Sequence, residues 1–172
     1  MDSFETIYRR HASAVFRFAW GLCGDRSGAE DIVSETFVRI LTKAPKIKTQ
    51  TALAYLLAVA RNTYLTGQRK RRREVPLTDE IPAPLQDPAD RLDDQARLAS
   101  VFKALGNLPE GERAALLLRV DHELPYEDIA SALDISVGAA KVRVHRARMR
   151  LADALAGKDE QKGGHRETRS HS

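Results

Sequence analysis

The chain has 172 residues, of which 42% are hydrophobic and 30% charged, and this composition fits one ordinary or two small folded domains. No apolar run approaches the roughly 20 residues of a membrane helix, and the N-terminus lacks the basic start and apolar stretch of a signal peptide, so we expect a cytoplasmic protein without membrane insertion. Cys23 is the only cysteine, which excludes an internal disulfide, while the formal net charge of +4 is modest and its distribution along the chain matters more.

Three helices are predicted in the first half from apolar residues at helical spacing. They span residues 3–22, 27–44 and 51–72. We expect Asp2 with Glu5, and Ser27 with Glu30, to form capping boxes at the first two helix starts. Gly24 is expected to end the first helix.

The next segment has a different composition. It is rich in proline and acidic residues and has too few apolar residues to pack, which predicts a flexible linker. The predicted organisation is an N-terminal helical domain over 1–73, the linker over 74–90, a C-terminal helical domain over 91–156 and a disordered polar tail over 157–172.

Four further helices are predicted in the C-terminal domain. Asp87 and Pro88 favour the start of the first, which reaches Leu105. The others begin near Pro109, Pro125 and Ser136, and the last is expected to end at Gly157. With no convincing strand, the expected fold class is all-α.

Residues 125–141 have the pattern of a helix-turn-helix, a short helix followed by a three-residue turn and a longer basic helix. The second helix of such a unit enters the major groove of DNA. Asp134 stands in the turn where glycine is usual, and we expect it to adopt the left-handed conformation at some cost.

Cations surround the apolar stripe of this last helix. At about 100° per residue, Lys141, His145 and Arg148 are predicted to flank the stripe, and Arg143, Arg146 and Arg150 to cover the far face. Such a helix suits DNA phosphates. The alternative, docking on a membrane or an acidic partner, is disfavoured because the stripe consists largely of Ala and Val, which insert poorly into lipid.

A second basic block covers residues 61–73, which hold six Lys or Arg and no acid. Asn62, Tyr64 and Gln68 are interleaved with these cations. Amides, an aromatic ring and cations together suit binding of unpaired bases. The alternative, a solvated helix end whose cations favour the helix dipole, explains some of the cations but not the polar inserts.

The second helix repeats Asp31, Glu35 and Arg39 every four residues. From the spacing alone, an ordinary surface ladder of ion pairs is the preferred interpretation.

An enzyme is the least supported class of function. The five histidines and Cys23 lack metal-ligand spacing, and there is no Gly-rich phosphate loop and no nucleophile elbow. We therefore expect no catalytic residues, no metal, no cofactor and no small-molecule substrate.

Several segments together resemble the extracytoplasmic-function (ECF) sigma factors of bacterial RNA polymerase. Residues 29–41 resemble their polymerase-binding helix, and residues 54–62 resemble the helix that follows. Residues 105–151 resemble their final helix-turn-helix domain. The similarity runs from Phe4 to Leu155 in the family's order and spacing.

The resemblance implies three sets of functional residues and promoter-specific initiation with core RNA polymerase. The polymerase clamp would bind Asp31, Glu35, Thr36 and Arg39, which replaces the interpretation as a mere surface ladder. The minus-ten strand would bind Lys46, Lys48, Arg61, Asn62, Tyr64, Gln68, Arg69, Lys70 and Arg71. The minus-thirty-five duplex would bind Ser136, Val137, Gly138, Ala139, Lys141, Val142, Arg143, His145, Arg146 and Arg148.

The chain departs from the family's usual residues at several positions. Tyr55 stands where Trp is usual, Val142 and Val144 flank Arg143, and Pro125 replaces a frequent capping Ser. The promoter sequence is therefore not predicted. The flexible linker further suggests regulation by an anti-sigma factor that covers surfaces of both domains. The alternative function is a sigma-like adaptor or mimic that binds regulatory partners without reading DNA, and the retained basic blocks argue against it.

Overall fold

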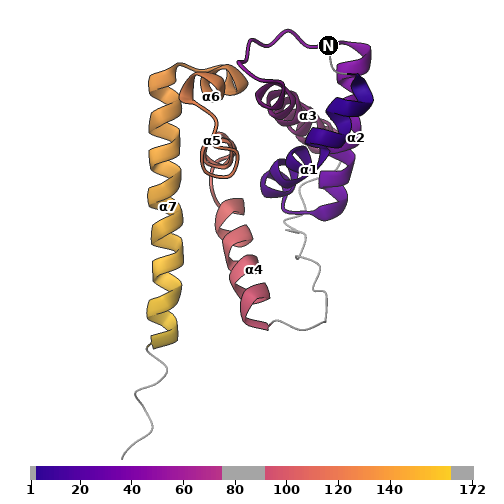
Figure 1. Cartoon of the computed structure of the whole chain (residues 1–172). Coiled ribbons are helices and arrows are strands. Elements are labelled where there is room, and N and C mark those ends of the chain that lie inside the picture. Colours follow the sequence, from indigo (N-terminus) through magenta and orange to yellow (C-terminus); the bar gives the residue numbers. More distant parts are fainter. Residues whose placement is uncertain (1–2, 75–91, 164–172) are drawn as a thin grey trace, which may run out of the picture.

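The computed structural model describes residues 3–74 and 92–163, and all regular structure in these ranges is helical (Figure 1). Seven helices follow one another, which confirms the all-α prediction. They are α1 (Phe4–Cys23), α2 (Arg26–Thr42), α3 (Ala52–Glu74), α4 (Leu92–Gly106), α5 (Glu110–Val120), α6 (Tyr126–Leu133) and α7 (Val137–Gly163). The predicted linker lies almost entirely outside the described residues.

The first two helices begin at caps other than the predicted ones. Ser3 is the N-cap of α1 and its hydroxyl accepts from the Thr6 N–H, whereas a capping box at Asp2 was expected. Asp25 is the N-cap of α2 and accepts from the Gly28 N–H at 2.8 Å, which replaces the expected box at Ser27. A carboxylate placed before the first turn satisfies a free N–H and favours the helix dipole, so α2 begins at Arg26, one residue before the predicted start. The helix ends at Thr42, two residues before the predicted end.

The helix-turn-helix forms as predicted. Asp134 ends α6 in the left-handed region, with φ 54° and ψ 51°, and its N–H donates to carbonyls of α6. Ser136 then begins α7 by accepting from the Ala139 N–H at 3.1 Å. The backbone reverses with a residue that tolerates positive φ, so glycine is not needed there.

The far end of α7 differs from the prediction. The helix passes Gly157 and continues to Gly163, so the expected break is wrong. An exposed glycine inside a helix costs only about 1 kcal/mol, and the following Lys, Glu and Gln residues are good helix formers. Residues 164–172 of the predicted tail lie outside the described part of the chain.

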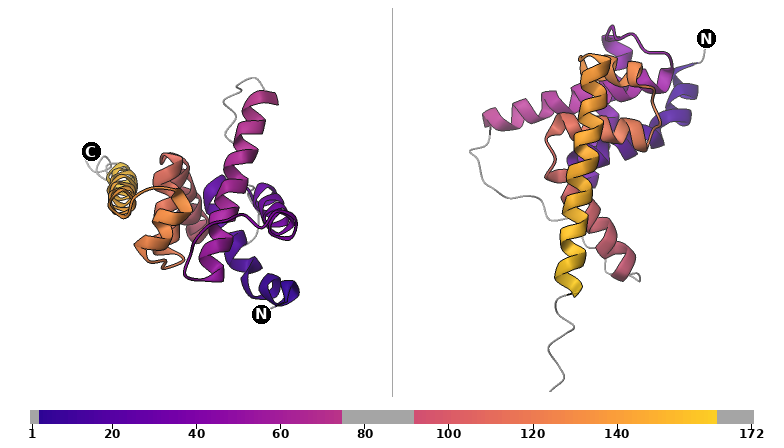
Figure 2. Two further views of the ribbon diagram at one scale, coloured as in Figure 1. Left: turned by 90° about the horizontal axis from the view of Figure 1, so that it is seen from above. Right: turned by 90° about the vertical axis from the view of Figure 1, so that its left-hand side faces the viewer.

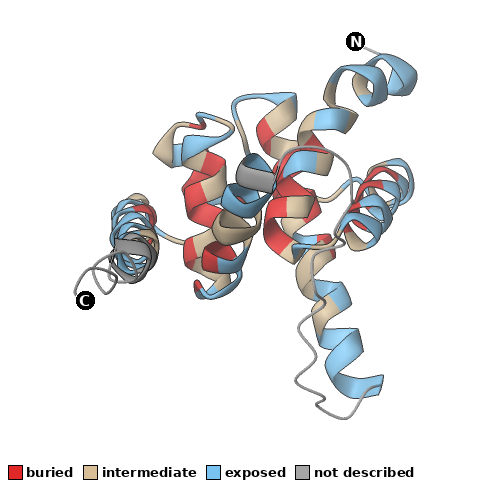
Figure 3. Cartoon of the chain, turned by 90° about the horizontal axis from the view of Figure 1, so that it is seen from below, coloured by how far each residue is buried: buried red, intermediate tan, exposed pale blue. Residues whose placement is uncertain are grey.

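The helices form two units, an N-terminal unit (α1 to α3) and a C-terminal unit (α4 to α7), which lie side by side (Figures 1 and 2). Phe18, Leu22 and Leu57 are buried in the first unit, and Leu118 and Ile129 in the second. All five belong to one contiguous apolar cluster. Figure 3 shows the buried residues on the sides of the central helices that face one another. The two units therefore pack together through α1 and α3 on one side and α4, α5 and α6 on the other.

Candidate nucleic-acid and polymerase interfaces

The start of α7 presents most of its predicted DNA-binding residues to solvent. Ala140, Val144 and Ala147 are buried and fix the orientation of the helix. The exposed predicted residues are Ser136, Gly138, Lys141, Val142, His145, Arg146 and Arg148, while Val137 and Ala139 are half-buried. The helix thus shows a continuous polar and cationic strip beside an apolar seam, as binding to a DNA backbone requires.

Arg143 and Arg150 do not cover the far face of α7, which corrects the predicted arrangement. The Arg143 side chain passes so close to Gly111 of α5 that a Cβ there would lie 2.5 Å from its guanidinium nitrogen. Arg150 pairs with the nearly buried Glu112 of α5 at 3.4 Å, without the alignment of a hydrogen bond. These positions lie about 80–100° from the apolar stripe, so they flank it on the side of α5. Only Arg146 of the three faces away.

Lys141 takes part in a small stack at the helix-turn-helix. The Arg119 guanidinium carbon lies 4.4 Å from the centre of the Tyr126 ring, and the Lys141 ammonium lies 5.7 Å from the same ring. Cation–π contacts of this kind hold the start of α7 against α6. Sequence reasoning did not identify Arg119 or Tyr126 as supports of the recognition helix.

The basic end of α3 projects beyond the core of the N-terminal unit. Asn62, Arg69, Lys70 and Arg71 are exposed, and Tyr64 and Gln68 are half-buried. Arg61 differs from all of these. Its Nε and Nη2 atoms donate to the two carboxylate oxygens of Glu110 at 2.8 Å each, and its side chain is only 11% exposed.

The loop before α3 carries the other predicted strand-binding residues. Lys46 and Lys48 are both exposed. The Tyr55 hydroxyl donates to the Pro45 carbonyl at 2.7 Å and ties the loop to α3, and partial burial raises the pKa of this phenol. Residue 55, where Trp is usual in the family, therefore contacts the loop through its hydroxyl.

The predicted polymerase-binding residues of α2 do not all reach the surface. Asp31 and Glu35 are exposed, and Glu35 pairs with Arg39 at 3.1 Å. Thr36 is fully buried and its hydroxyl donates to the Ile32 carbonyl at 2.6 Å. This placement corrects the prediction for Thr36, because its position beside Phe37 puts it on the core side of the helix.

A hydrophobic patch beside this ladder was not recognised in the sequence. Phe4, Tyr8, Val38 and Leu41 remain 37–62% exposed. Phe4 and Tyr8 meet the buried Phe37 ring edge-on, with centroids 5.9 and 4.8 Å away. The sequence feature that could have indicated this patch is Val38, an aliphatic residue on the polar side of α2.

A groove between α2 and α3 connects the acidic ladder with the basic helix. Asp31 and Glu35 line one wall, and Tyr64, Gln68 and Arg71 line the other. Cys23 also lines the groove, its thiol donates to the Asp25 carbonyl, and burial raises the pKa of this thiol. A thiol with a raised pKa is a poor nucleophile at neutral pH, so Cys23 is not activated for covalent chemistry in this environment.

Neither a metal centre nor a membrane helix is found in the described ranges. No three His, Cys, Asp or Glu side chains there group as metal ligands. Within residues 3–74 and 92–163, no helix is both long and apolar enough to cross a bilayer.

Comparison with known proteins places the chain in a family. Residues 7–74 match the family model of sigma-70 region 2, and residues 98–151 match that of sigma-70 region 4. The chain is 34% identical to ECF RNA polymerase sigma factor SigE of Mycolicibacterium smegmatis over 91% of its own length, although it spans only 63% of that protein. It is also 34% identical to EcfG of Rhodopseudomonas palustris, over 80% of this chain and 77% of EcfG. For RNA polymerase sigma-E factor of Streptomyces coelicolor the identity is 32%, over 91% and 88%.

Solved structures agree. The sigma factor RpoE from Bartonella quintana, crystallised with the anti-sigma factor NepR, matches with a TM-score of 0.75 and 30% identity, over 89% of this chain and 96% of RpoE. CnrH, solved with the cytosolic domain of CnrY, shares the fold with a TM-score of 0.66 at 23% identity, over 90% and 88%. Two sigma-70 regions in the family's order cover most of the chain, and an ECF sigma factor of 34% identity matches it over 80% of its length, so this protein belongs to the ECF family of RNA polymerase sigma factors.

Proposed function

We propose that this protein binds core RNA polymerase in the bacterial cytoplasm and directs promoter-specific transcription initiation. The single observation that carries the proposal is the presence of two cationic helices, α3 and α7, on separate units of a chain built from sigma-70 regions 2 and 4. Two such surfaces are suited to two promoter elements. The proposed division is residues 1–73 for polymerase binding and the minus-ten element, and residues 91–156 for the minus-thirty-five element.

The proposed polymerase surface is the exposed side of α2. Asp31, Glu35 and Arg39 supply charges, and Val38 and Leu41 beside them supply apolar area that water solvates poorly. A polar ladder next to exposed aliphatic residues has the composition of a protein interface rather than of an ordinary solvated face. Thr36 supports this side from within the core.

The proposed strand-binding surface joins the end of α3 with the preceding loop. Arg69, Lys70 and Arg71 would neutralise phosphates, and Tyr64 and Gln68 would contact unpaired bases. Both kinds of group stand on one helix, with Lys46 and Lys48 on the loop before it.

The proposed duplex-reading surface is the first turns of α7. Lys141, Arg146 and Arg148 would contact phosphates, and the small residues Gly138 and Ala139 allow the helix backbone to approach base edges closely. Because phosphate contacts release counterions, the DNA affinity that this surface provides should depend strongly on salt concentration.

Transcription reconstituted with core polymerase on genomic DNA of the host tests the proposal. The wild-type chain is expected to produce defined start sites that core enzyme alone does not produce. Replacing Lys141, Arg143 and Arg146 with Ala should lower specific initiation by at least about tenfold while polymerase binding persists. The matched control removes the same charge at Arg9, Arg26 and Lys103, which lie outside the proposed surfaces, and should initiate normally. Start sites no more specific than those of core enzyme would refute the proposal.

The same experiment addresses the adaptor alternative. A chain that binds polymerase or regulators without reading DNA would be indifferent to the α7 triple variant. Loss of initiation with retained polymerase binding therefore favours DNA reading over mimicry.

An anti-sigma factor is the proposed regulator. The support is the similarity to RpoE, which was solved bound to NepR and which this chain matches across both units. Purification of the tagged protein from non-inducing cells should recover a second, non-polymerase partner. Recovery of polymerase subunits alone would contradict this part of the proposal.

A further inference from the structure

The C-terminal unit places two carboxylates against the proposed strand-binding region of the N-terminal unit. Glu110, the first residue of α5, accepts two parallel hydrogen bonds of 2.8 Å from Arg61 in the middle of α3. Asp128 of α6 accepts from the backbone N–H of Gln50 at 3.0 Å, just before α3 begins. Both contacts join residues far apart in the sequence, separated by 49 and 78 positions.

The Glu110 contact imitates a phosphate contact. A guanidinium presents the same fork of two N–H groups to a carboxylate as to a phosphate. The Arg61 and Glu110 side chains are 11% and 25% exposed, so the pair is largely shielded from water and salt. Arg69, Lys70 and Arg71 on the same helix remain exposed. Of the predicted strand-binding cations of α3, Arg61 is thus the one already occupied by a carboxylate of the other unit.

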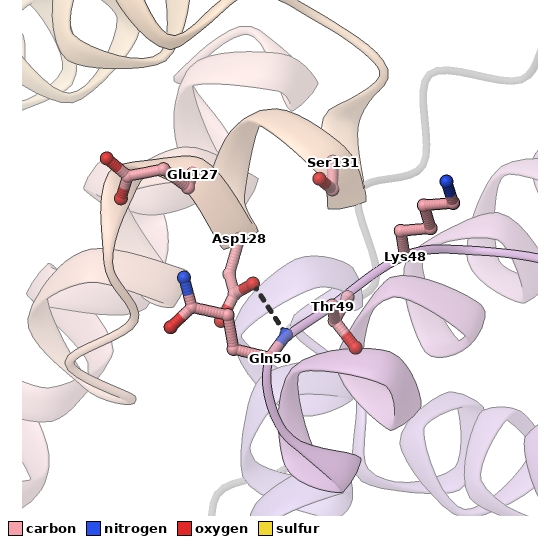
Figure 4. Close-up of a pocket in the computed structure, with 6 residues that line it drawn as sticks. All are labelled: Lys48, Thr49, Gln50, Glu127, Asp128 and Ser131. Atoms are coloured by element: carbon pink, nitrogen blue, oxygen red, sulfur yellow. Dashed lines mark hydrogen bonds between the residues drawn. The ribbon is translucent and has the colours of Figure 1, made fainter.

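The Asp128 contact closes the other end of the same surface. Asp128 is 2% exposed, and its Oδ2 atom is buried without a hydrogen-bond partner. Figure 4 shows its carboxylate directed at the Gln50 N–H, in a pocket that Lys48, Thr49 and Ser131 also line. The loop that carries Lys46 and Lys48 is therefore fastened to α6 at its C-terminal end.

Apolar contacts hold the two units together between these carboxylates. Leu117 of α5 packs directly on the backbone of Gly21 in α1, where a Cβ would lie 2.8 Å from a Leu117 methyl carbon. The rings of Trp20 and Phe102 lie 5.1 Å apart, centre to centre. Arg113 donates to the Leu22 carbonyl at the end of α1. A shared apolar face with charged contacts at its border resembles an ordered interface between partners.

We propose that this closed arrangement is autoinhibited: Glu110 and Asp128 substitute for DNA phosphates on Arg61 and the adjoining loop, so strand binding requires the two units to separate. The proposal rests on the proposed function, since α3 must be a strand-binding helix for its closure to inhibit anything. When most chains are closed, the apparent affinity for a single strand is the affinity of the open form multiplied by the fraction of chains that are open.

The first test uses the full-length protein and a fluorescein-labelled single-stranded oligonucleotide of mixed sequence. The double variant Glu110→Gln and Asp128→Asn removes both charges with little change in shape. It should bind the oligonucleotide at least about tenfold more tightly than wild type. The emission of Trp20, the only tryptophan, should shift to the red as Phe102 moves away. A control double variant, Glu5→Gln and Glu30→Gln, alters net charge equally in exposed surface pairs and should change neither signal.

A second variant opens the interface without touching a charge. Gly21→Leu places a side chain where Leu117 already lies, and should produce the same red shift and the same gain in affinity. Adding Arg61→Ala to the carboxylate variant should abolish most of that gain while the emission stays shifted. Circular dichroism of each variant should show unchanged helix content.

The outcomes are separable from those of the proposed function. Unchanged emission and affinity in both opening variants would overturn the proposal, and so would a red shift without tighter strand binding. The wild-type chain is tested for initiation with core polymerase independently, since polymerase can supply the energy for opening. Failure there, with the opening variants behaving as expected, counts against the sigma function and not against closure.

Discussion

The two cationic helices differ in how ready they are to bind. Lys141, Arg146 and Arg148 of α7 face solvent on a helix whose position is already fixed by a buried seam. Arg61 of α3 is paired with a carboxylate of the opposite unit, and the loop before α3 is fastened to α6. The comparison teaches that the proposed duplex-reading surface is preformed, whereas the proposed strand-binding surface is partly covered by the other unit. On the proposed closure, strand binding would therefore follow separation of the units.

The largest expected effect concerns the core that both regions share. Ile129 of α6 is fully buried in the cluster that spans both units. Ile129→Ala should destabilise the protein by about 2–5 kcal/mol, measured by urea denaturation. If the units form one cooperative body, both circular dichroism and Trp20 emission will report a single shifted transition. Two separate transitions would contradict a shared core. Ala156→Gly at the exposed end of α7 is the control.

The next effect tests whether the α7 surface is ready in the free chain. Arg146 is exposed and faces away from the other helices. Arg146→Ala should leave thermal stability within about 0.5 kcal/mol of wild type but lower promoter affinity of the assembled holoenzyme, with the salt slope reduced by about 1. Arg9→Ala, an exposed cation of α1, should leave the slope unchanged. An unaltered slope in Arg146→Ala would place the phosphate contacts elsewhere.

Substitutions at two glycines are each expected to change the free energy of unfolding by about 1 kcal/mol. Gly138 lies in the first turn of α7 with open space around its Cα, so Gly138→Ala should raise stability by up to about 1 kcal/mol. If the helix backbone approaches DNA there, the same change will reduce initiation. Gly24 ends α1 at φ 72°, and Gly24→Ala should lower stability by about 1 kcal/mol with no separate effect on DNA. Melting temperature and initiation together distinguish the two sites.

The smallest effect is a dependence of closure on pH. His122 lies against the Phe18 ring at the interface, with centroids 5.8 Å apart, and Asp121 and Arg17 lie beside it. Burial lowers the pKa of His122, Arg17 lowers it further, and Asp121 opposes them. The folded, closed form therefore disfavours the imidazolium.

The neutral His122 ring contributes its full stabilisation above pH 6.5, the ordinary pKa of histidine. This stabilisation is lost as the pH falls below 6.5 toward the lowered pKa that His122 has in the folded protein. Acidification from pH 7.5 to 5.5 should shift Trp20 emission to the red, and His122→Gln should flatten this response. His145→Gln, in the exposed part of α7, should not. An identical response in His122→Gln would exclude the histidine as its cause.

Local features of the fold could be predicted because they depend on neighbours in sequence. Apolar periodicity predicted all seven helices, and the left-handed Asp134 was expected from the turn pattern. Cap choice was less predictable, since Ser3 and Asp25 competed with equally good neighbours. The continuation of α7 beyond Gly157 shows that one glycine is a weak stop signal among strong helix formers.

The candidate sites were predicted as surfaces, but their tertiary contacts were not. Nothing near Arg61 in the sequence indicates Glu110 as its partner, because the pair depends on how two units dock. Thr36 was assigned to an interface and is buried, since one position on a helix separates the two faces. Arg143 was assigned to the far face of α7 but lies beside α5, where Gly111 leaves room for its guanidinium.

That last contact makes the proposed DNA-binding surface of α7 dependent on a residue of another helix. Gly111 lacks a side chain, and the Arg143 guanidinium lies over it. Any larger residue at position 111 would redirect Arg143 and so change what the recognition helix presents, with its own sequence intact. If Arg143 contacts DNA as proposed, the DNA-facing surface of α7 therefore depends on position 111 of α5 as well as on the sequence of α7 itself.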